Sequence, residues 1–183
     1  KRAQLGDRVT HTDSVRVEGR DRKREPEKMY LLINKPTGDI VKSGDDFEDL
    51  PPDVYPIGHQ DPQSSGLLIL TNDASLGKHL FHPRNAIETE YVVAVDRPLK
   101  KIDVGRLQSG VPLEGIKPVA SKVRQLDGQK FAIVIQNEQP QNIRLMCEAL
   151  GYQVVKMMRT RIGTLKIPMS SPEGGYRNLT EKA

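Results

Sequence analysis

Apolar residues in this chain gather in short runs that are separated by turn-forming residues. The clearest runs are MYLLIN at 29–34, LLILT at 67–71 and YVVAVD at 91–96. Their lengths, and the Gly, Pro, Asn and Asp residues around them, predict β-strands. KVRQL and KFAIVIQN are separated by Asp127-Gly128 and predict a hairpin. Two further strands are expected in YQVVKMM and RIGTLKI, close to the C-terminal end.

A different period marks residues 140–150, which predict the clearest helix of the chain. Apolar side chains recur there at i, i+3, i+4 and i+7, namely at Ile143, Met146, Cys147 and Leu150. Pro140 suits the first turn of this helix, and Gly151 suits its C-terminal end. Shorter helices are expected from Asn72 or Asp73 to Phe81 and over 101–109. About six strands with few helices predict an α+β domain built on a mainly antiparallel mixed sheet.

Charge and pattern change near residue 28 and divide the chain of 183 residues. Residues 1–28 hold nine Lys or Arg against six Asp or Glu, a net +3 of the total +4. Within them, 1–19 alternates like short strands around Val9, Val15 and Val17, and is too small to bury a core. Residues 20–28 are almost all charged and predict a linker. A domain is therefore expected over 29–183. The basic segment suits contact with phosphates, although a solvated linker would have the same composition.

Several classes of protein find no support in the composition. No apolar run approaches the length of a transmembrane helix, and no secretory signal pattern opens the sequence, so we expect a cytoplasmic protein. The single cysteine, Cys147, cannot form an internal disulfide. His79 and His82 lack a third ligand at a metal-binding spacing, and no nucleotide-binding motif is present. We therefore expect no metal and no cofactor, and nothing suggests an obligate oligomer, so we expect a monomer.

Three side chains are candidates for chemistry, and each has an ordinary structural alternative. Asp61 lies before Pro62 in a loop that precedes a buried strand, which suits a nucleophile or base but is also common in solvated turns. Arg144, at the edge of the apolar face of helix 140–150, either points into a cleft or extends to water. Tyr91 begins a strand and is either a core residue or a stacking platform for a base.

Taken together, the motifs resemble the bacterial ribosomal pseudouridine synthases of the RsuA type, and most of all their RluF branch. The resemblance runs over most of 29–183 and rests on the following segments in order: NKPTG, YPIG, GHQDPQSSGLLILTND, EYVVAVD, GVPLEG, IRLMCEALGY, MMRTRIG and GGYRNLT. It implies the catalytic fold of that family, an RNA substrate and no cofactor or metal. It also implies that 1–19 is the end of a small RNA-binding domain.

The resemblance further assigns roles by position. Asp61 falls on the catalytic aspartate, Tyr91 on the tyrosine that packs against the target uracil, and Arg144 on the arginine that pairs with the aspartate. Met157 falls on a leucine that walls the pocket. Substrate-binding positions are implied at Lys35, His59, Asn142, Met157 and Arg159. The expected substrate is structured RNA, with 23S ribosomal RNA as the first choice and transfer RNA as an alternative.

This chain also departs from the family pattern. His59-Gln60 replaces the usual Arg-Leu before the aspartate, and positions 141 and 145 carry Gln and Leu where the family has Arg. Three positive charges are thereby lost, which should weaken contact with the RNA backbone. The alternative hypothesis is a weakly active or silent RNA-binding relative that serves as a chaperone or assembly factor. A third hypothesis, an interaction domain unrelated to RNA, rests only on the near-neutral charge of 29–183.

Overall fold

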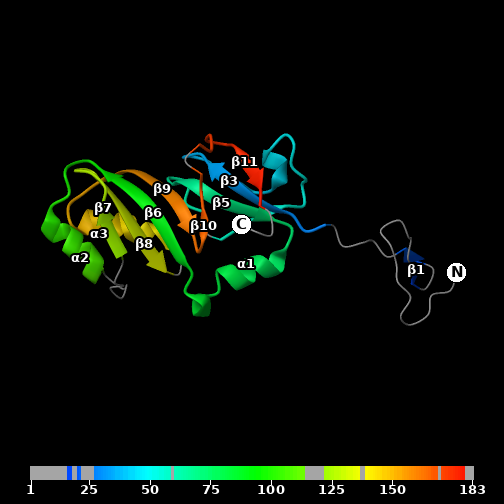
Figure 1. Cartoon of the computed structure of the whole chain (residues 1–183), viewed down its shortest axis with the longest axis horizontal. Helices are drawn as coiled ribbons and strands as arrows, with labels where there is room; N and C mark the ends of the chain where they lie inside the picture. Colours follow the sequence, from blue (N-terminus) through cyan, green and yellow to red (C-terminus); the bar gives the residue numbers. More distant parts are fainter. Residues whose placement is uncertain are drawn as a thin grey trace.

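The computed structural model describes residues 27–58, 60–113, 122–136, 139–168 and 170–179, and the backbone of two short strands near the start of the chain (Figure 1). These two strands, β1 (Arg16–Val17) and β2 (Arg20–Asp21), pair antiparallel. The strand expected around Val15 and Val17 is therefore described in part, whereas Val9 lies outside the described residues. Strand β2 falls within the segment 20–28 for which a linker is expected.

Within the described residues, one nine-stranded sheet forms the body of the domain. Its strands are β3 (Tyr30–Lys35), β4 (Tyr55–Ile57), β5 (Ser65–Thr71), β6 (Glu88–Val95), β7 (Lys122–Gln125), β8 (Lys130–Gln136), β9 (Val154–Ile162), β10 (Leu165–Lys166) and β11 (Tyr176–Asn178). The order is β11-β3-β5-β9-β6-β8-β7, with β4 beside β5 and β10 beside β9. Strands β5 and β9 pair parallel, and the other described pairs are antiparallel. The predicted mainly antiparallel mixed sheet is confirmed.

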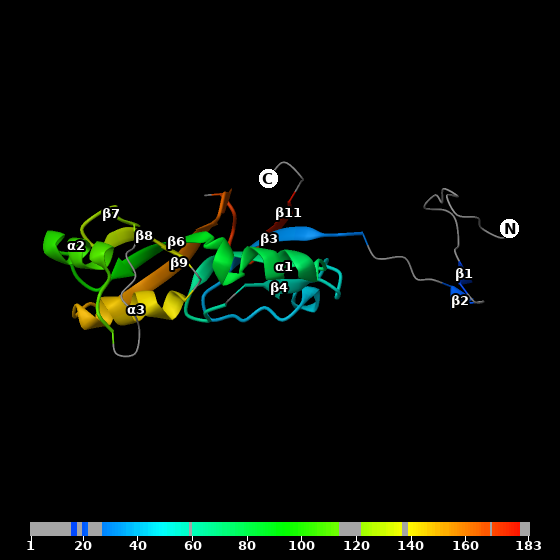
Figure 2. The ribbon, with the colours of Figure 1, turned by 90° about the horizontal axis from the view of Figure 1, so that it is seen from below.

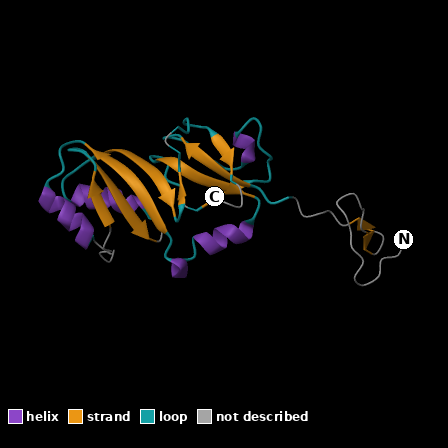
Figure 3. Cartoon of the chain, viewed as in Figure 1, coloured by secondary structure: helices purple, strands orange, loops and turns teal. Residues whose placement is uncertain are grey.

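Few helices accompany this sheet (Figure 3). They are α1 (Ala74–Leu80), α2 (Lys101–Ser109) and α3 (Pro140–Ala149), with short 3-10 turns η1 (Gly44–Asp46) and η2 (Pro83–Asn85). All three predicted helices are confirmed, with Asp73 as the N-cap of α1 and Pro140 in the first turn of α3. In the described part of the chain, no helix is both long and apolar enough to cross a membrane.

The two strands predicted near the C-terminal end are present, with different bounds. Strand β9 runs unbroken from Val154 to Ile162, past the end of YQVVKMM, and β10 covers only Leu165–Lys166 of RIGTLKI. Strand β9 pairs with β6 along this whole length, and two register shifts absorb the irregularities. Arg159 lies between the two predicted segments, and it is buried, with only 6% of it exposed. The turn comes later, at Gly163, where β10 folds back on β9.

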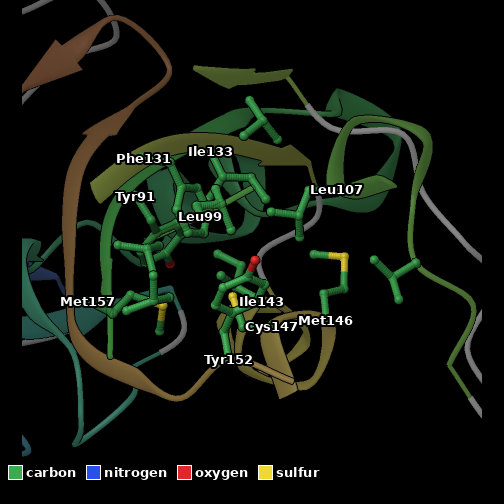
Figure 4. Packing of buried hydrophobic residues seen from close by; sticks show 14 residues of the cluster. Tyr91, Leu99, Leu107, Phe131, Ile133, Ile143, Met146, Cys147, Tyr152 and Met157 are labelled. Atoms are coloured by element: carbon green, nitrogen blue, oxygen red, sulfur yellow. The ribbon is translucent and has the colours of Figure 1, made fainter. Parts of the chain in front are cut away.

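The sheet has two halves that differ in how they are covered. Strands β3 and β5 are buried on both faces, which explains their continuous apolar runs. Strand β6 alternates buried and partly exposed residues, so one face of it is buried. Helices α2 and α3 cover that face (Figure 2), and Figure 4 shows Ile143 and Cys147 of α3 opposite Tyr91 and Ile133. The parallel pair β5–β9 joins the two halves.

Candidate active site

Asp61 begins the tight turn 61–64 that leads into β5. The backbone N–H of Ser64 donates to the carbonyl of Asp61 at 3.0 Å, which closes the turn. The side chain of Asp61 is bonded within the same turn: Gln63 N–H donates to Oδ1 at 3.0 Å and Ser64 Oγ donates to Oδ2 at 2.5 Å. Asp61 is therefore a turn residue, which is the structural alternative given above for this position. Its remaining contact goes beyond that role.

That contact comes from helix α3. Arg144 Nη2 lies 3.3 Å and Nε 3.4 Å from Oδ2 of Asp61, and Nη2 also donates to the carbonyl of Gln63 at 2.8 Å. Only 22% of the Arg144 side chain and 16% of the Asp61 side chain are exposed. Arg144 thus points toward the aspartate loop instead of extending to water, and it holds both the carboxylate and the backbone of the turn.

The end of α3 fixes the position of this arginine along the helix axis. Gly151 has φ +81°, which favours glycine, and its N–H donates to Glu148 O at 2.8 Å. Tyr152 N–H donates to Cys147 O, also at 2.8 Å. Together these two bonds form a Schellman motif that ends the helix where the sequence predicted. The buried Ile143, next to Arg144, holds the helix against the core.

A small cavity of about 10 Å³ lies beside Asp61, room for about one water molecule. Lys35, Tyr91 and Arg159 line it from β3, β6 and β9. The rest of the lining comes from the loop (Gln60, Asp61 and Ser64), the start of β5 (Ser65, Gly66 and Leu67) and the first turn of α3 (Pro140). Tyr91 is 1% exposed and Arg159 6%. Asp61 is the one acidic side chain in this lining, whereas Lys35 and Arg159 are basic.

Gly66 allows the strands of the two halves to approach each other at this point. It pairs with Arg159 across the parallel β5–β9 junction, and its φ is +101°. A Cβ atom at position 66 would lie 2.3 Å from the carbonyl oxygen of Arg159, so only glycine fits. Arg159 Nε also donates to Leu67 O at 2.6 Å across the same junction. This close approach is what brings Arg159 and Tyr91 next to the aspartate turn.

The electrostatics of the site keep the carboxylate ionised. Burial by itself raises the pKa of Asp61, but the hydrogen bonds from Ser64 and Gln63 and the charge of Arg144 outweigh it, so that pKa lies below its usual value. Burial lowers the pKa of Lys35, which Asp39 and Asp61 oppose and Arg159 reinforces. The Lys35 ammonium donates to the carbonyls of Pro36 and Asp39 at 2.8 and 2.9 Å.

The other residues assigned by resemblance lie in different surroundings. The side chain of Asn142 donates to Gln139 Oε1 at 2.8 Å, and Asn142 does not line the cavity. Met157 is fully buried in the core cluster that contains Tyr91 (Figure 4), and it does not line the cavity. His59 lies outside the described residues. At the two other positions that lost a charge, Gln141 is exposed and Leu145 is 41% exposed, so both departures fall on the open face of α3.

Ser64 was not among the residues singled out from the sequence, and Gln60 was noted only as a departure from the family pattern. Ser64 bonds the carboxylate directly, and the pattern Asp-Pro-Gln-Ser was a usable signal, because Asp at the start of a Pro-containing turn bonds the residues that follow it. Gln60 bonds the backbone of Val41. That contact joins residues 19 apart in sequence, and no local pattern indicates it.

Comparison with known proteins shows the family to which the chain is similar. Residues 29–149 match the family model of RNA pseudouridylate synthase. The chain is 36% identical over 191 residues to the dual-specificity RNA pseudouridine synthase RluF of Escherichia coli K12, covering 99% of this chain and 65% of that protein. It is 35% identical over 192 residues to the ribosomal large subunit pseudouridine synthase B of Bacillus subtilis, covering 97% of this chain and 78% of that one.

A solved structure has the same fold. It is described as a crystal structure of pseudouridylate synthase, and it matches with a TM-score of 0.76 and 25% identity over 98% of this chain and 82% of that one. The chain spans 65% of the length of the E. coli relative, so a third of that protein has no counterpart here. On the strength of the family model and of these relatives, the chain belongs to the RNA pseudouridylate synthase family.

Proposed function

We propose that the protein is an RNA pseudouridine synthase that isomerises a uridine to pseudouridine, with Asp61 as the catalytic nucleophile or base. The observation that carries the proposal is the pairing of Asp61 with Arg144 beside a cavity lined by Tyr91. A partly buried carboxylate with a guanidinium partner, at the junction of two sheet halves, is suited to chemistry on a bound base.

The reaction explains the residue types. The bond from C1′ of the ribose to N1 of uracil breaks, the base turns, and a new bond forms from C1′ to C5, whose proton is then transferred to solvent or to N1. No atoms are gained or lost and no oxidant is needed, so side chains suffice. Asp61 acts at the anomeric centre as nucleophile or base, and Tyr91 holds the face of the detached base.

The neighbours of Asp61 keep its carboxyl group ionised. The hydrogen bonds from Ser64 and Gln63 and the charge of Arg144 keep its pKa low, so the carboxylate is charged at neutral pH. Lys35 and Arg159 add positive charge to the cavity wall. An excess of positive charge around a single carboxylate favours a polyanionic substrate, which RNA is.

The uridine must leave its stack to reach this site, as in other enzymes that act on a base. The cavity holds about one water molecule, far less than a pyrimidine needs. Binding therefore requires the aspartate turn and the first turn of α3 to separate. Arg144 joins these two elements, and its contacts with Asp61 and Gln63 are the ones that must adjust.

We propose structured RNA as the substrate, with large-subunit ribosomal RNA as the first target and transfer RNA as an alternative. The names of the B. subtilis and E. coli relatives support an RNA target, and the former names the large ribosomal subunit. In this proposal 29–183 is the catalytic domain, 20–28 is a linker, and 1–19 is the end of an RNA-binding domain. The enzyme works as a cytoplasmic monomer, without metal or cofactor.

A deletion strain provides the test. Ribosomal and transfer RNA from strains with and without the protein are treated with carbodiimide, which marks pseudouridine, and are read by primer extension. We expect one or a few uridines to lose the mark in the deletion strain and to regain it when purified protein is added to the unmodified RNA. Unchanged maps, together with RNA binding by the protein, would instead favour the silent RNA-binding relative.

A further inference from the structure

Gln60, the residue immediately before Asp61, is tied by both ends of its side-chain amide to one backbone unit. Val41 N–H donates to Oε1 of Gln60 at 3.0 Å, and Nε2 of Gln60 donates to Val41 O at 2.7 Å. The pair copies the reciprocal bonding of two residues in an antiparallel sheet. We propose that Gln60 is a positioning residue that fixes Asp61 in its reactive position. This inference rests on the proposed function, because it assumes that Asp61 is catalytic.

Val41 is a firm anchor for this contact. It is 5% exposed and packs in the core cluster of β3 and β5, with Leu31, Ile33, Val54, Leu68 and Leu70. The loop around Asp61 is therefore attached, through Gln60, to side chains that do not move without disrupting the core. The loop is thus supported both by β5, which follows it, and by Val41.

The same support holds the other side of the aspartate. Gly38 N–H donates to Pro62 O at 2.7 Å, and Pro62 is the residue immediately after Asp61. The side chain of Lys35 also holds residues 36–39, because its ammonium group donates to the carbonyls of Pro36 and Asp39. Residues 36–41, here called the brace segment, thus contact the chain directly before and directly after Asp61.

A glutamine is the side chain that this geometry requires. Leucine, which the family usually has at this position, fills a similar volume but can neither donate nor accept a hydrogen bond. It would leave the N–H and carbonyl of the nearly buried Val41 without the partner they have here. Glutamate would still accept from the N–H, but its carboxylate would face the carbonyl oxygen and add a negative charge beside Asp61.

The consequence for catalysis is a matter of distance. Asp61 must approach one atom of the ribose within reacting distance, and a displacement of about 1 Å is enough to cost on the order of a hundredfold in rate. Arg144 and Ser64 bond the carboxylate and the backbone of the turn that follows, at the carbonyls of Gln63 and Asp61, whereas Gln60 holds the chain immediately before Asp61. Loss of the Gln60–Val41 pair should therefore lower kcat by about tenfold to a hundredfold, with little change in KM.

The test compares the full chain with Gln60→Leu and Gln60→Glu. Gln108→Leu is a matched control, because Gln108 also donates from its side chain to a backbone carbonyl, that of Val123 at 3.0 Å, but on α2 outside the cavity lining. For each protein, kcat and KM are measured on the RNA identified by carbodiimide mapping, and amide hydrogen exchange is measured at Val41. We expect a lower kcat and faster exchange at Val41 for Gln60→Leu, and neither change for Gln108→Leu.

Gln60→Glu keeps the inference testable if Gln60→Leu does not fold. The added charge should raise the pKa of Asp61, so the acid limb of the kcat profile should move to higher pH. A kcat within twofold of wild type for the folded Gln60 variants, or unchanged exchange at Val41, would overturn the positioning role. If Asp61→Asn is as active as wild type, the proposed function has failed instead. Exchange at Val41 then still decides whether Gln60 holds the loop.

Discussion

Two aspartates stand at opposite ends of strand β5 and have nearly the same hydrogen-bonding pattern. Asp61 precedes the strand and Asp73 follows it. Each accepts from the backbone N–H two residues ahead, from a serine hydroxyl and from a basic side chain. For Asp73 these partners are Ser75 and Lys28, and Tyr30 donates as well. Both carboxyls have pKa values below their usual range.

What separates the two is the space in front of the carboxylate. Asp61 faces a cavity with Lys35, Tyr91 and Arg159 in its lining, and its basic partner is 22% exposed. Asp73 caps helix α1, and its partner Lys28 is 59% exposed. A low pKa and a full set of hydrogen bonds therefore do not identify a catalytic carboxylate. The feature that distinguishes Asp61 from Asp73 is the cavity beside it.

The largest expected effect comes from replacing the carboxylate of Asp61 by an amide, and the same replacement at Asp73 is the control. Asp61→Asn keeps the size of the side chain but removes its nucleophilicity and basicity, so pseudouridine formation should fall by at least about 10⁴-fold, to below detection. Asp73→Asn should leave the rate unchanged. Single-turnover assays on the mapped RNA measure both, with circular dichroism as the check on folding. Appreciable turnover by Asp61→Asn would remove Asp61 from the mechanism.

The next largest effect concerns the basic partner of Asp61. Arg144→Met should lower the rate by about a hundredfold. The carboxylate of Asp61 loses its charge partner in this variant, and the carbonyl of Gln63 loses its donor. The pKa of Asp61 should rise in this variant, which shifts the acid limb of the pH–rate profile upward. Arg144→Lys is the control: it keeps the charge but not the planar fork, so we expect an intermediate rate. A rate for Arg144→Met within a few-fold of wild type would show that the ion pair does not serve catalysis.

The sequence predicted the two ends of β5 to different degrees. The cap Asp73 and helix α1 follow from local pattern, because an N-cap bonds residues within one turn. The turn around Asp61 was equally readable, but its partner Arg144 and the cavity residue Tyr91 are far away in sequence, and only the family resemblance assigned them to the site. Gln60 was read as a departure from the pattern, while its contact with Val41 depends on tertiary structure. Strand β9 extends beyond the predicted segment YQVVKMM, and Arg159, which follows that segment, is buried at the junction of the halves.

A smaller effect is expected on stability. The effect of replacing Asp73 should depend on pH, because the charged form of its carboxyl is the stabilising one. The pKa of Asp73 is depressed in the folded protein, chiefly by the hydrogen bond from Ser75 and then by those from Lys28 and Tyr30. Its contribution to stability is therefore present above the unfolded value of about 3.9 and is lost as the pH falls through the folded value. Asp73→Asn should lower Tm by a few degrees at pH 7 and by less at pH 3. Differential scanning calorimetry at the two pH values measures this, and an equal loss at both would assign the effect to packing.

The smallest effect should come from the basic partner of Asp73, the counterpart of Arg144. Lys28→Met removes an ion pair with an Nζ–Oδ2 distance of 2.9 Å, but 59% of the lysine side chain is exposed. Exposed pairs contribute little, because water already screens the charges and ordering a long side chain costs entropy. We expect Tm to change by no more than a degree or two at low salt, the change to vanish at about 1 M salt, and the single-turnover rate to stay the same. The measurement is a salt series of thermal melts beside the rate assay used for Arg144→Met. If Lys28→Met lowered the rate as Arg144→Met is expected to, the two ends of β5 would be coupled, and the distinction between a capping carboxylate and a catalytic one would fail for this protein.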